Sequence, residues 1–444
     1  MKGDARATGA GAEAAEPPRH GRVRRRSGVS TYLKLAASVI AVLAVSAAAV
    51  VAYAAVDLVR TVQQKPTVTL ANEEILEGAP DIGAIDGGLT FLLVGSDKRP
   101  ADGSFGDPDI DSAVLNDVTM LVHLSQDHSH VEVVSFPRDM LVSVPECPDP
   151  ADSTNTLSAL FETPLNGVLG YGGLACVALT IEQLTGVKIP VGGVVEFQGV
   201  AALAEAVGGI EVCLADPVDD IRSGLHLAAG KHVITGYTAL AFLRTRHGVG
   251  DGSDLGRIAS QQTFLASLAR TMQASGTLGD PVKLYSIAKV ILSNVQLSNA
   301  MQNPVTLVAI ARALQAVDLG RITFVQYPTV YTSDLRYVTP SASAAAVNLA
   351  LQQDLPLAVN PNATTDAPFG TIPDPTPPAP TTTPGPLPPL APEPAVPLGP
   401  EPSPEASATS TPTPTPTVPP ATLLPDDVTG LTADEVRCAT ANPG

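Results

Sequence analysis

Apolar positions form one unbroken run near the start of the chain, then alternate with polar positions, and later nearly vanish. The charge-free run covers residues 35–56, and about 20 apolar residues suffice to cross a bilayer. We therefore predict a transmembrane helix there, between a cytoplasmic basic tail (residues 1–34) and an extracytoplasmic neck (residues 57–89), because the preceding arginines orient the N-terminus toward the cytoplasm. A cleaved signal peptide is the alternative, although its apolar core is usually shorter.

Strand-like and helical patterns alternate through residues 90–359, which we predict to form one domain. Short apolar runs predict strands at residues 89–95, 118–124, 131–136, 194–197, 209–214 and 322–326. Helical spacing predicts helices at residues 173–185, 199–207, 236–243, 254–272, 282–291, 304–316 and 341–351, with Asp254 as N-cap of the fourth. The polar turn at residues 125–130 predicts a hairpin. We therefore expect an α/β fold, a three-layer α/β/α sandwich with a mixed central sheet.

Composition changes the picture at the end of the chain and in its overall charge. Residues 360–425 are rich in Pro, Thr, Ala and Ser, which predicts a disordered, extended spacer that buries no core. The C-terminal tail at residues 426–444 carries Cys438, and its segment 431–438 regains some helical character. The net charge of −18 argues against a nucleic-acid partner, because such proteins need a cationic face.

The four cysteines predict disulfides. They include no Cys-x-x-Cys pair, and exported domains usually oxidise their cysteines. Cys176 opens a predicted helix and Cys213 ends a predicted strand, so we prefer a Cys176–Cys213 bridge. Cys438 would then hold the C-terminal tail near Cys147. Buried, unpaired thiols are the alternative.

Arginine is scarce after the transmembrane run, yet three arginines lie within fourteen positions. Arg244 and Arg246 are two residues apart, so one helix cannot aim both at the same point. We expect the chain to leave the helix there. Asp254, Arg257 and Gln261 share one face of the next helix. Guanidinium groups bind phosphate oxygens in bidentate fashion, so this pattern predicts a phosphate clamp; a surface ion-pair cluster would have the same pattern.

Two further polar segments follow predicted strands. These are Gly95-Ser-Asp-Lys-Arg99 and Ser135-Phe-Pro-Arg-Asp139, at strand ends where α/β proteins bind ligands. Asp97 and Asp117 are suited to hold Mg²⁺ or Mn²⁺ together, since Mg²⁺ prefers one or two carboxylates plus substrate phosphate. A strand-end aspartate is also a common turn former. His123, His128 and His130 show no metal-site spacing, and we expect them to be core or solvated groups.

Eight short motifs occur in a fixed order. They are Gly95-Ser-Asp97, Asp117, Phe136-Pro-Arg-Asp139, Leu165-Asn-Gly-Val-Leu-Gly-Tyr-Gly-Gly173, Thr180-Ile-Glu-Gln-Leu-Thr-Gly186, Ala204-Glu-Ala-Val-Gly-Gly-Ile-Glu-Val212, Leu240-Ala-Phe-Leu-Arg-Thr-Arg246 and Gly252-Ser-Asp-Leu-Gly-Arg257. Together they resemble the LytR-CpsA-Psr family of cell-wall glycopolymer ligases across residues 90–257, and more loosely to residue 355. The Pro-rich tail and the cysteines resemble its actinobacterial branch.

The resemblance implies a membrane-anchored, extracytoplasmic phosphotransferase that moves a glycopolymer from a polyprenyl-pyrophosphate carrier to peptidoglycan. It implies that Asp97 and Asp117 hold the metal ion, and that an apolar tunnel between sheet and helices holds the polyprenyl chain. Asp139 is a candidate general base or a partner that orients Arg138. The implied catalytic residues are Arg138, Arg244, Arg246 and Arg257, and the implied substrate-binding residues are Arg99, Asp139, Asn166, Asp254 and Gln261.

Two positions depart from the family pattern. The family commonly has arginine where this chain has Leu115 and Ser260. Either Lys98 or Arg99 compensates, or the substrate has changed or activity is lost. Two other functions therefore stay open: a non-catalytic wall protein that binds lipid-linked glycan in the same pocket, and a pyrophosphatase of the lipid carrier that uses water as acceptor.

Overall fold

The computed structural model describes most of the chain between residues 28 and 442. The described ranges are residues 28–63, 68–73, 88–98, 114–152, 154–250, 252–274, 280–302, 304–360, 369–370 and 420–442. The first 27 residues, most of the Pro-rich segment and Arg99 lie outside the described residues. The chain divides into two compact units, residues 1–56 and residues 57–444.

Helix α1 (Gly28–Gln63) contains the charge-free run. Its segment Val29–Thr61 is 33 residues long, and none of it is buried. At 1.5 Å per residue this exceeds the roughly 30 Å of a bilayer's hydrocarbon core. Helix α1 is thus apolar and long enough to cross a membrane.

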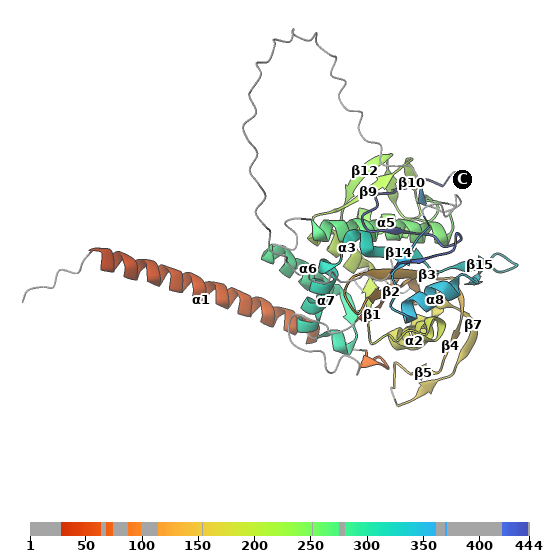
Figure 1. Cartoon of the computed structure of the whole chain (residues 1–444), viewed down its shortest axis with the longest axis horizontal. Helices are drawn as coiled ribbons and strands as arrows, with labels where there is room; N and C mark the ends of the chain where they lie inside the picture. The colour runs from red at the N-terminus through yellow and green to blue at the C-terminus, as the bar shows by residue number, and fades with distance from the viewer. Residues whose placement is uncertain are drawn as a thin grey trace, which may run out of the picture. The chain divides into compact units, whose positions relative to one another are not determined.

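A seven-stranded mixed sheet forms the centre of the second unit (Figure 1). The predicted hairpin is present, with β2 antiparallel to both β1 and β3, while β1–β8 and β3–β14 pair in parallel. The mixed sheet is therefore confirmed. Its strand order is β13 (Val295–Leu297), β8 (Val191–Glu196), β1 (Leu89–Ser96), β2 (Asn116–Leu124), β3 (Val131–Phe136), β14 (Ile322–Gln326) and β20 (Gly430–Thr432).

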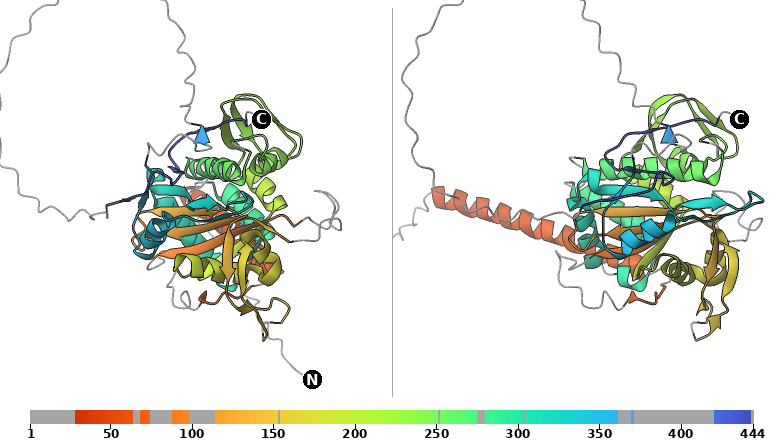
Figure 2. Two further views of the ribbon diagram at one scale, coloured as in Figure 1. Left: turned by 90° about the vertical axis from the view of Figure 1, so that its right-hand side faces the viewer. Right: turned by 45° about the vertical axis from the view of Figure 1, so that its right-hand side comes forward.

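Helices cover both faces of this sheet (Figure 2). Helices α2 (Val168–Thr185) and α8 (Ala344–Gln352) share one core with it. Helices α5 (Asp254–Gln273), α6 (Pro281–Asn294) and α7 (Pro304–Ala316) share the core on the other face. The three-layer α/β/α sandwich is confirmed, and each face buries its own apolar cluster.

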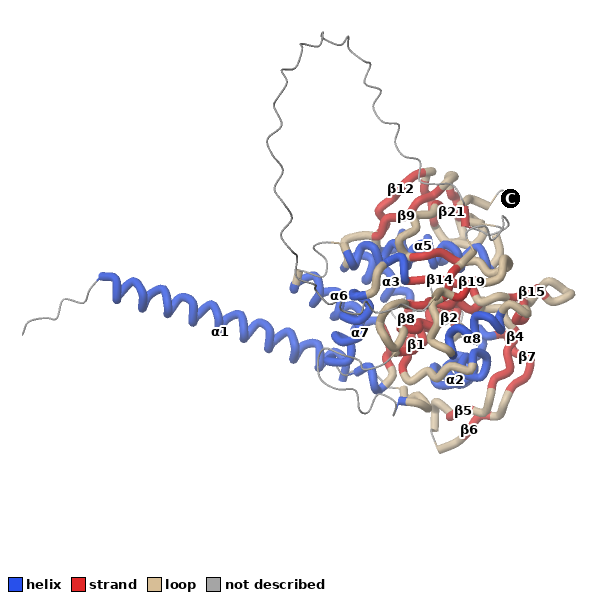
Figure 3. Tube along the Cα trace, in the orientation of Figure 1, coloured by secondary structure: helices blue, strands red, loops and turns tan. Residues whose placement is uncertain are grey.

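A second, smaller sheet packs on the far side of α5, so α5 lies between two sheets (Figure 3). This explains why α5 is buried almost all round, rather than along the single apolar stripe typical of a surface helix. Its polar residues Ser260, Gln261, Gln262 and Ser267 are buried. The smaller sheet and its two helices are β12 (Gly230–Ile234), β9 (Ile210–Leu214), β21 (Cys438–Ala439), β18 (Phe369–Gly370), α3 (Phe197–Ala206) and α4 (Gly236–Arg244).

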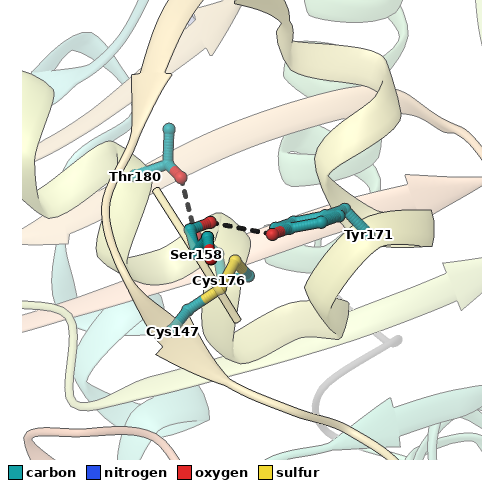
Figure 4. The surroundings of a disulfide bond; sticks show 5 residues. All are labelled: Cys147, Ser158, Tyr171, Cys176 and Thr180. Carbon is teal, nitrogen blue, oxygen red and sulfur yellow. Dashed lines mark hydrogen bonds between the residues drawn. A yellow bond between two sulfur atoms is a disulfide. The ribbon is translucent and has the colours of Figure 1, made fainter. Parts of the chain in front are cut away.

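The disulfides join Cys147 to Cys176 and Cys213 to Cys438, so the preferred pairing was wrong. Figure 4 shows Cys176 of α2 bonded to Cys147, beside the Tyr171 hydroxyl that donates to the carbonyl of Ser158. Strand β21 pairs in parallel with β9, and this contact between distant segments places Cys438 next to Cys213. Local sequence patterns carry no information about such a pairing.

The C-terminal tail returns to the domain as strands, so its predicted helical character was wrong. Strand β20 extends the large sheet beside β14, and β21 joins the small one. Beyond β21, Ala441 pairs with Val249, and the amide of Gly250 donates to the Thr440 carbonyl at 2.9 Å. The tail therefore braces the loop that connects α4 to α5.

Candidate functional site

Asp117 lies at an irregularity between β1 and β2. Gly95 pairs with Val118 and Ser96 pairs with Asn116, so Asp117 is the extra residue of a β-bulge. A bulge redirects a side chain and is common beside functional sites. Nothing in the local sequence indicates it.

Three guanidinium groups converge on one oxygen of Asp117. The Oδ1 atom lies 2.6 Å from Arg138 Nη1, 3.8 Å from Arg246 Nη2 and 3.8 Å from Arg257 Nη1. Arg257 Nη2 also donates to the Asp117 carbonyl at 2.7 Å. The three arginines follow β3, follow α4 and lie on α5. The structure thus brings together four of the predicted site residues from four separate segments.

Asp254 holds two of these arginines. Its Oδ1 lies 2.6 Å from Arg257 Nη2 and 3.7 Å from Arg138 Nε, and its Oδ2 accepts from the Arg138 backbone amide at 3.2 Å. The N-cap of α5 is Ser253, whose hydroxyl accepts from two backbone amides of the first turn. The prediction of Asp254 as N-cap was wrong, and its carboxylate is directed to the arginines instead.

Asp139, Asn166 and Gln261 surround the same cluster. Asp139 Oδ2 lies 3.5 Å from Arg138 Nε, and Asn166 Nδ2 donates to Asp139 Oδ1 at 3.5 Å. The Asn166 backbone amide donates to the Arg138 carbonyl at 2.9 Å. Gln261 is buried, and its Nε2 donates to the carbonyl of Leu243, which ties α5 to α4. These contacts orient the arginine-bearing segments.

Arg244 and Arg246 separate as expected, because the helix ends between them. Thr245 has extended backbone angles and is the C-cap of α4. Arg244 is exposed at the last position of the helix, whereas Arg246 is partly buried and faces Asp117. The role of Arg244 stays a prediction.

Asp220 holds Thr245 in place, and sequence reasoning missed it. Asp220 ends β10 (Val218–Asp220) and is buried; its Oδ2 accepts from the Thr245 hydroxyl at 2.5 Å. Thr245 is itself fully buried. A side chain at Gly248 would collide with this pair, since its Cβ would lie 2.8 Å from Thr245 Oγ1. The contact fixes the turn that aims Arg246, and no sequence motif marks Asp220.

The pKa values reflect burial and the close approach of the three guanidinium groups to Asp117 and to one another. Burial acts to raise the pKa of Asp117, but the charges of Arg257, Arg138 and Arg246 outweigh it, so the pKa is lowered. Burial first, and then the charges of Arg257 and Arg138, lower the pKa of Arg246. The buried Nε–H of Arg257 has no hydrogen-bond acceptor among the described residues. An anion with several oxygens would offer an acceptor to the Arg257 Nε–H and would reduce the repulsion among the guanidinium groups.

Asp97 and Asp117 are chemically suited to a divalent cation. Burial, and also the charge of Asp117, raise the pKa of Asp97 even though the Leu115 amide donates to Asp97 Oδ1 at 2.9 Å. Two carboxylates that repel each other in this way suit a hard cation. No group of three or more His, Cys, Asp or Glu side chains suited to a metal ion occurs in the described part of the chain.

The two departures from the family pattern have structural roles here. The Leu115 carbonyl accepts from the Asp97 amide, and the Leu115 amide donates to Asp97 Oδ1. Its neighbour Asn116 is fully buried, and the Asn116 side-chain oxygen accepts from the Leu169 amide near the start of α2. Ser260 is buried within α5, where its hydroxyl donates to the Gly256 carbonyl. Neither position supplies a cation to the cluster.

One face of the large sheet keeps partly exposed apolar side chains beneath its helices. Phe91, Leu93, Val118 and Val195 are partly buried residues of the core on that face, as are Leu265 of α5 and Ile291 of α6. Central strands covered by helices are normally fully buried, so the layers do not close completely here. Val118 directly follows Asp117, so this apolar face adjoins the arginine cluster. Val194, the neighbour of Val195 on β8, belongs to the core on the opposite face.

Comparison with known proteins identifies a sequence family and several similar proteins. A sequence model described as the LytR_cpsA_psr family matches residues 52–353, more than two thirds of the chain. Cell wall biosynthesis protein LcpA of Corynebacterium glutamicum is 30% identical over 276 residues, which are 56% of this chain and 52% of that protein. The polyisoprenyl-teichoic acid–peptidoglycan teichoic acid transferase TagT of Bacillus subtilis is 25% identical over 317 residues, 69% of this chain and 89% of that protein.

Solved structures also match. The LytR-Csp2A-Psr enzyme from Actinomyces oris aligns with a TM-score of 0.47 and 21% identity, covering 64% of this chain and 94% of that chain. The matched region spans about half the length of LcpA and of its C. glutamicum relative LcpB.

Proposed function

The chain belongs to the LytR_cpsA_psr family, and from this premise we propose that it transfers a glycopolymer from a polyprenyl-pyrophosphate carrier to peptidoglycan. The names of LcpA and TagT, a cell wall biosynthesis protein and a teichoic acid transferase, support this reaction class. The observation that carries the proposal is the convergence of Arg138, Arg246 and Arg257 on one Asp117 oxygen.

This arrangement suits phosphoryl transfer because that chemistry depends mainly on positioning and charge neutralisation. The acceptor hydroxyl oxygen would attack the glycan-bearing phosphorus, the bond from that phosphorus to the bridging oxygen would break, and polyprenyl phosphate would leave. The three guanidinium groups would hold the diphosphate oxygens. Asp139 is the candidate to take the hydroxyl proton, and its contact with Arg138 also suits an orienting role.

Asp97 and Asp117 would hold Mg²⁺ or Mn²⁺. When bound, the cation would neutralise pyrophosphate oxygens beside the arginines. Asp97 directly follows β1, and Asp117 lies near the start of its partner strand β2. The Leu115 amide donates to Asp97 Oδ1 and fixes the orientation of that carboxylate. We expect activity to require a divalent cation.

The partly exposed apolar face beside Asp117 would receive the polyprenyl chain. Its side chains come from the sheet and from α5 and α6, the two layers between which the tunnel is expected. Helix α1 would anchor the protein with a cytoplasmic N-terminus and an extracytoplasmic domain. Two disulfides agree with an oxidising compartment.

The test uses the full-length protein in detergent micelles with a polyprenyl-pyrophosphate-linked glycan, peptidoglycan and Mg²⁺. We expect released polyprenyl phosphate and glycan covalently attached to peptidoglycan. A family member with arginine at the position matched by Leu115 serves as positive control. If that relative transfers glycan and this protein neither releases nor transfers it, the catalytic proposal is wrong. Release without attachment would indicate the pyrophosphatase instead.

Leu115 favours one alternative, a non-catalytic protein that binds lipid-linked glycan in the same site. Substituting Leu115→Arg separates the possibilities, because it adds the guanidinium group that the family pattern places there. A gain of about 100-fold or more in turnover would indicate a degenerate enzyme, since single charge-stabilising groups contribute about that much. No gain in an active protein would indicate that other groups compensate, and no gain in an inactive one would favour binding alone.

A further inference from the structure

Helix α6 is tied to the residue that directly follows the charge-free run. That run ends at Val56, and the next residue, Asp57, belongs to the same compact unit as α6. Lys289 Nζ lies 2.8 Å from Asp57 Oδ2, and the Tyr285 hydroxyl donates to the same oxygen. Lys289 Nζ also lies 5.8 Å from the centre of the Tyr285 ring. Two side chains of α6 therefore meet at the first charged position after the run.

The position of Asp57 in the sequence sets the depth of α6 relative to a membrane. One helical residue rises only about 1.5 Å, so Asp57 lies at the boundary of the hydrocarbon layer if residues 35–56 fill it. Side chains bonded to Asp57 then lie in the headgroup layer. Tyrosine and lysine are typical of this layer, because each joins an apolar body to a polar end.

The first turn of α6 exposes apolar side chains next to lysine. Val282 is 72% exposed and Leu284 is 38% exposed, and Lys283 between them is also exposed. Exposed aliphatic groups beside cations are characteristic of helices that bind at an anionic lipid surface. Because Lys289 and Tyr285 hold α6 against Asp57, the first turn of α6 would be the part that touches the lipid surface.

We infer that the first half of α6 lies in the headgroup layer of the membrane and inserts Val282, which shares a helix face with Tyr285 and Lys289, toward the acyl chains. The second half of α6 carries Ile291 and Leu292, which belong to the core with the partly exposed apolar face. A polyprenyl chain could then pass from the bilayer along α6 to that face without crossing water. This last step rests on the proposed function, whereas the membrane contact does not.

The chain contains no tryptophan, so single-tryptophan variants report one position each. The experiment places the full-length variants Val282→Trp and Val233→Trp in vesicles of phosphatidylcholine and phosphatidylglycerol, with and without bromine on the acyl chains. Val233 is the matched control, because it is 66% exposed on β12. Helices at the interface bury their apolar face about 5–10 Å deep, so brominated lipid should quench Val282→Trp at least about two-fold more than Val233→Trp.

Equal quenching of the two variants, or none in either, would overturn the inference. The variant Leu284→Trp tests the orientation of the helix, because Leu284 lies on the opposite side of α6 from Val282, and we expect it to be quenched less than Val282→Trp. Far-ultraviolet circular dichroism identifies any variant that fails to fold. The measurement contains no glycan substrate, so an inactive transferase leaves its outcome unchanged, and an absence of quenching leaves the transferase proposal intact.

Discussion

Buried ionisable groups lie at both ends of the large sheet, but the two ends differ in how positive and negative groups are paired. At one end, three guanidinium groups share the single oxygen Asp117 Oδ1. At the other end of β2, His123 lies between two partners, with Nδ1 2.7 Å from Thr90 Oγ1 and Nε2 2.9 Å from Asp354 Oδ1. Burial alone therefore does not distinguish a functional site; the convergence of several like-charged groups on one atom does.

The cavity beside His123 supports this distinction. It has a volume of about 280 Å³, and its lining includes His123, Lys188, Gln352 and Asp354. These side chains already have partners: Lys188 lies 3.5 Å from Glu182, and Gln352 donates to the Thr185 carbonyl at 2.6 Å. A ligand there would have to compete with bonds that exist, whereas an anion at the arginine end would add bonds that are missing.

The largest effect on activity should come from Arg138→Ala. The guanidinium group is the one closest to Asp117 Oδ1, at 2.6 Å, and removing one group that stabilises transition-state charge typically lowers the rate about 100- to 1000-fold. Release of polyprenyl phosphate from the lipid-linked glycan measures the loss. Arg336→Ala, in the exposed turn between β15 (Thr329–Tyr331) and β16 (Val338–Pro340), is the control and should keep full activity. Similar activity in both variants would show that Arg138 has no role in the reaction.

A smaller loss, about ten-fold, should follow from Thr245→Val, which removes the bond to Asp220 and leaves a buried carboxylate oxygen without that donor. The expected cause is misdirection of Arg246, because Thr245 precedes it directly. Thr245→Ser restores the hydroxyl and should recover most of the activity at an equal concentration of folded protein. If Ser and Val have the same activity, the Asp220–Thr245 contact serves stability alone.

The sequence predicts elements that local pattern decides and misses features that distant contacts decide. Apolar periodicity predicts β14 and α7 at the bounds they have in the structure. It fails for β20 and β21, because each becomes a strand only by pairing with a distant partner. The kink in α2 at Gly172 and Gly173 could have been read from the paired glycines.

The candidate site divides in the same way. The family resemblance and the spacing of residues 244–257 predict the three arginines that the structure brings together, which are Arg138, Arg246 and Arg257. The bulge at Asp117 depends on the register of β1 against β2, and the Asp220–Thr245 bond depends on how β10 packs on α4. Both are tertiary facts with no local signal. Near the site, Ser253 also could have been read from the sequence, because serine is a good N-cap residue and it directly precedes Asp254.

The smallest effect on activity should come from the opposite end of the sheet, where Glu132→Gln should change stability and leave transfer unchanged. Burial raises the pKa of Glu132 well above its ordinary value of 4.5, so the folded protein holds this proton at pH values where the unfolded chain has lost it. Stability contributed by Glu132 therefore falls as pH rises from 4.5 toward the raised pKa, by about 1.4 kcal/mol per pH unit.

His130 opposes this trend over part of the range. Burial lowers the pKa of His130 below 6.5, so its effect on stability rises with pH only up to about 6.5 and is then constant. Chemical denaturation of the wild type and Glu132→Gln at several pH values, each in a His130→Asn background, isolates the glutamate, because His130 Nε2 lies 3.8 Å from Glu132 Oε2 and would otherwise titrate together with it. The difference in unfolding free energy should shift in favour of Glu132→Gln as pH rises. A difference that is flat with pH would mean that Glu132 is ionised in the folded protein, and the two ends of the sheet would then both hold buried charge.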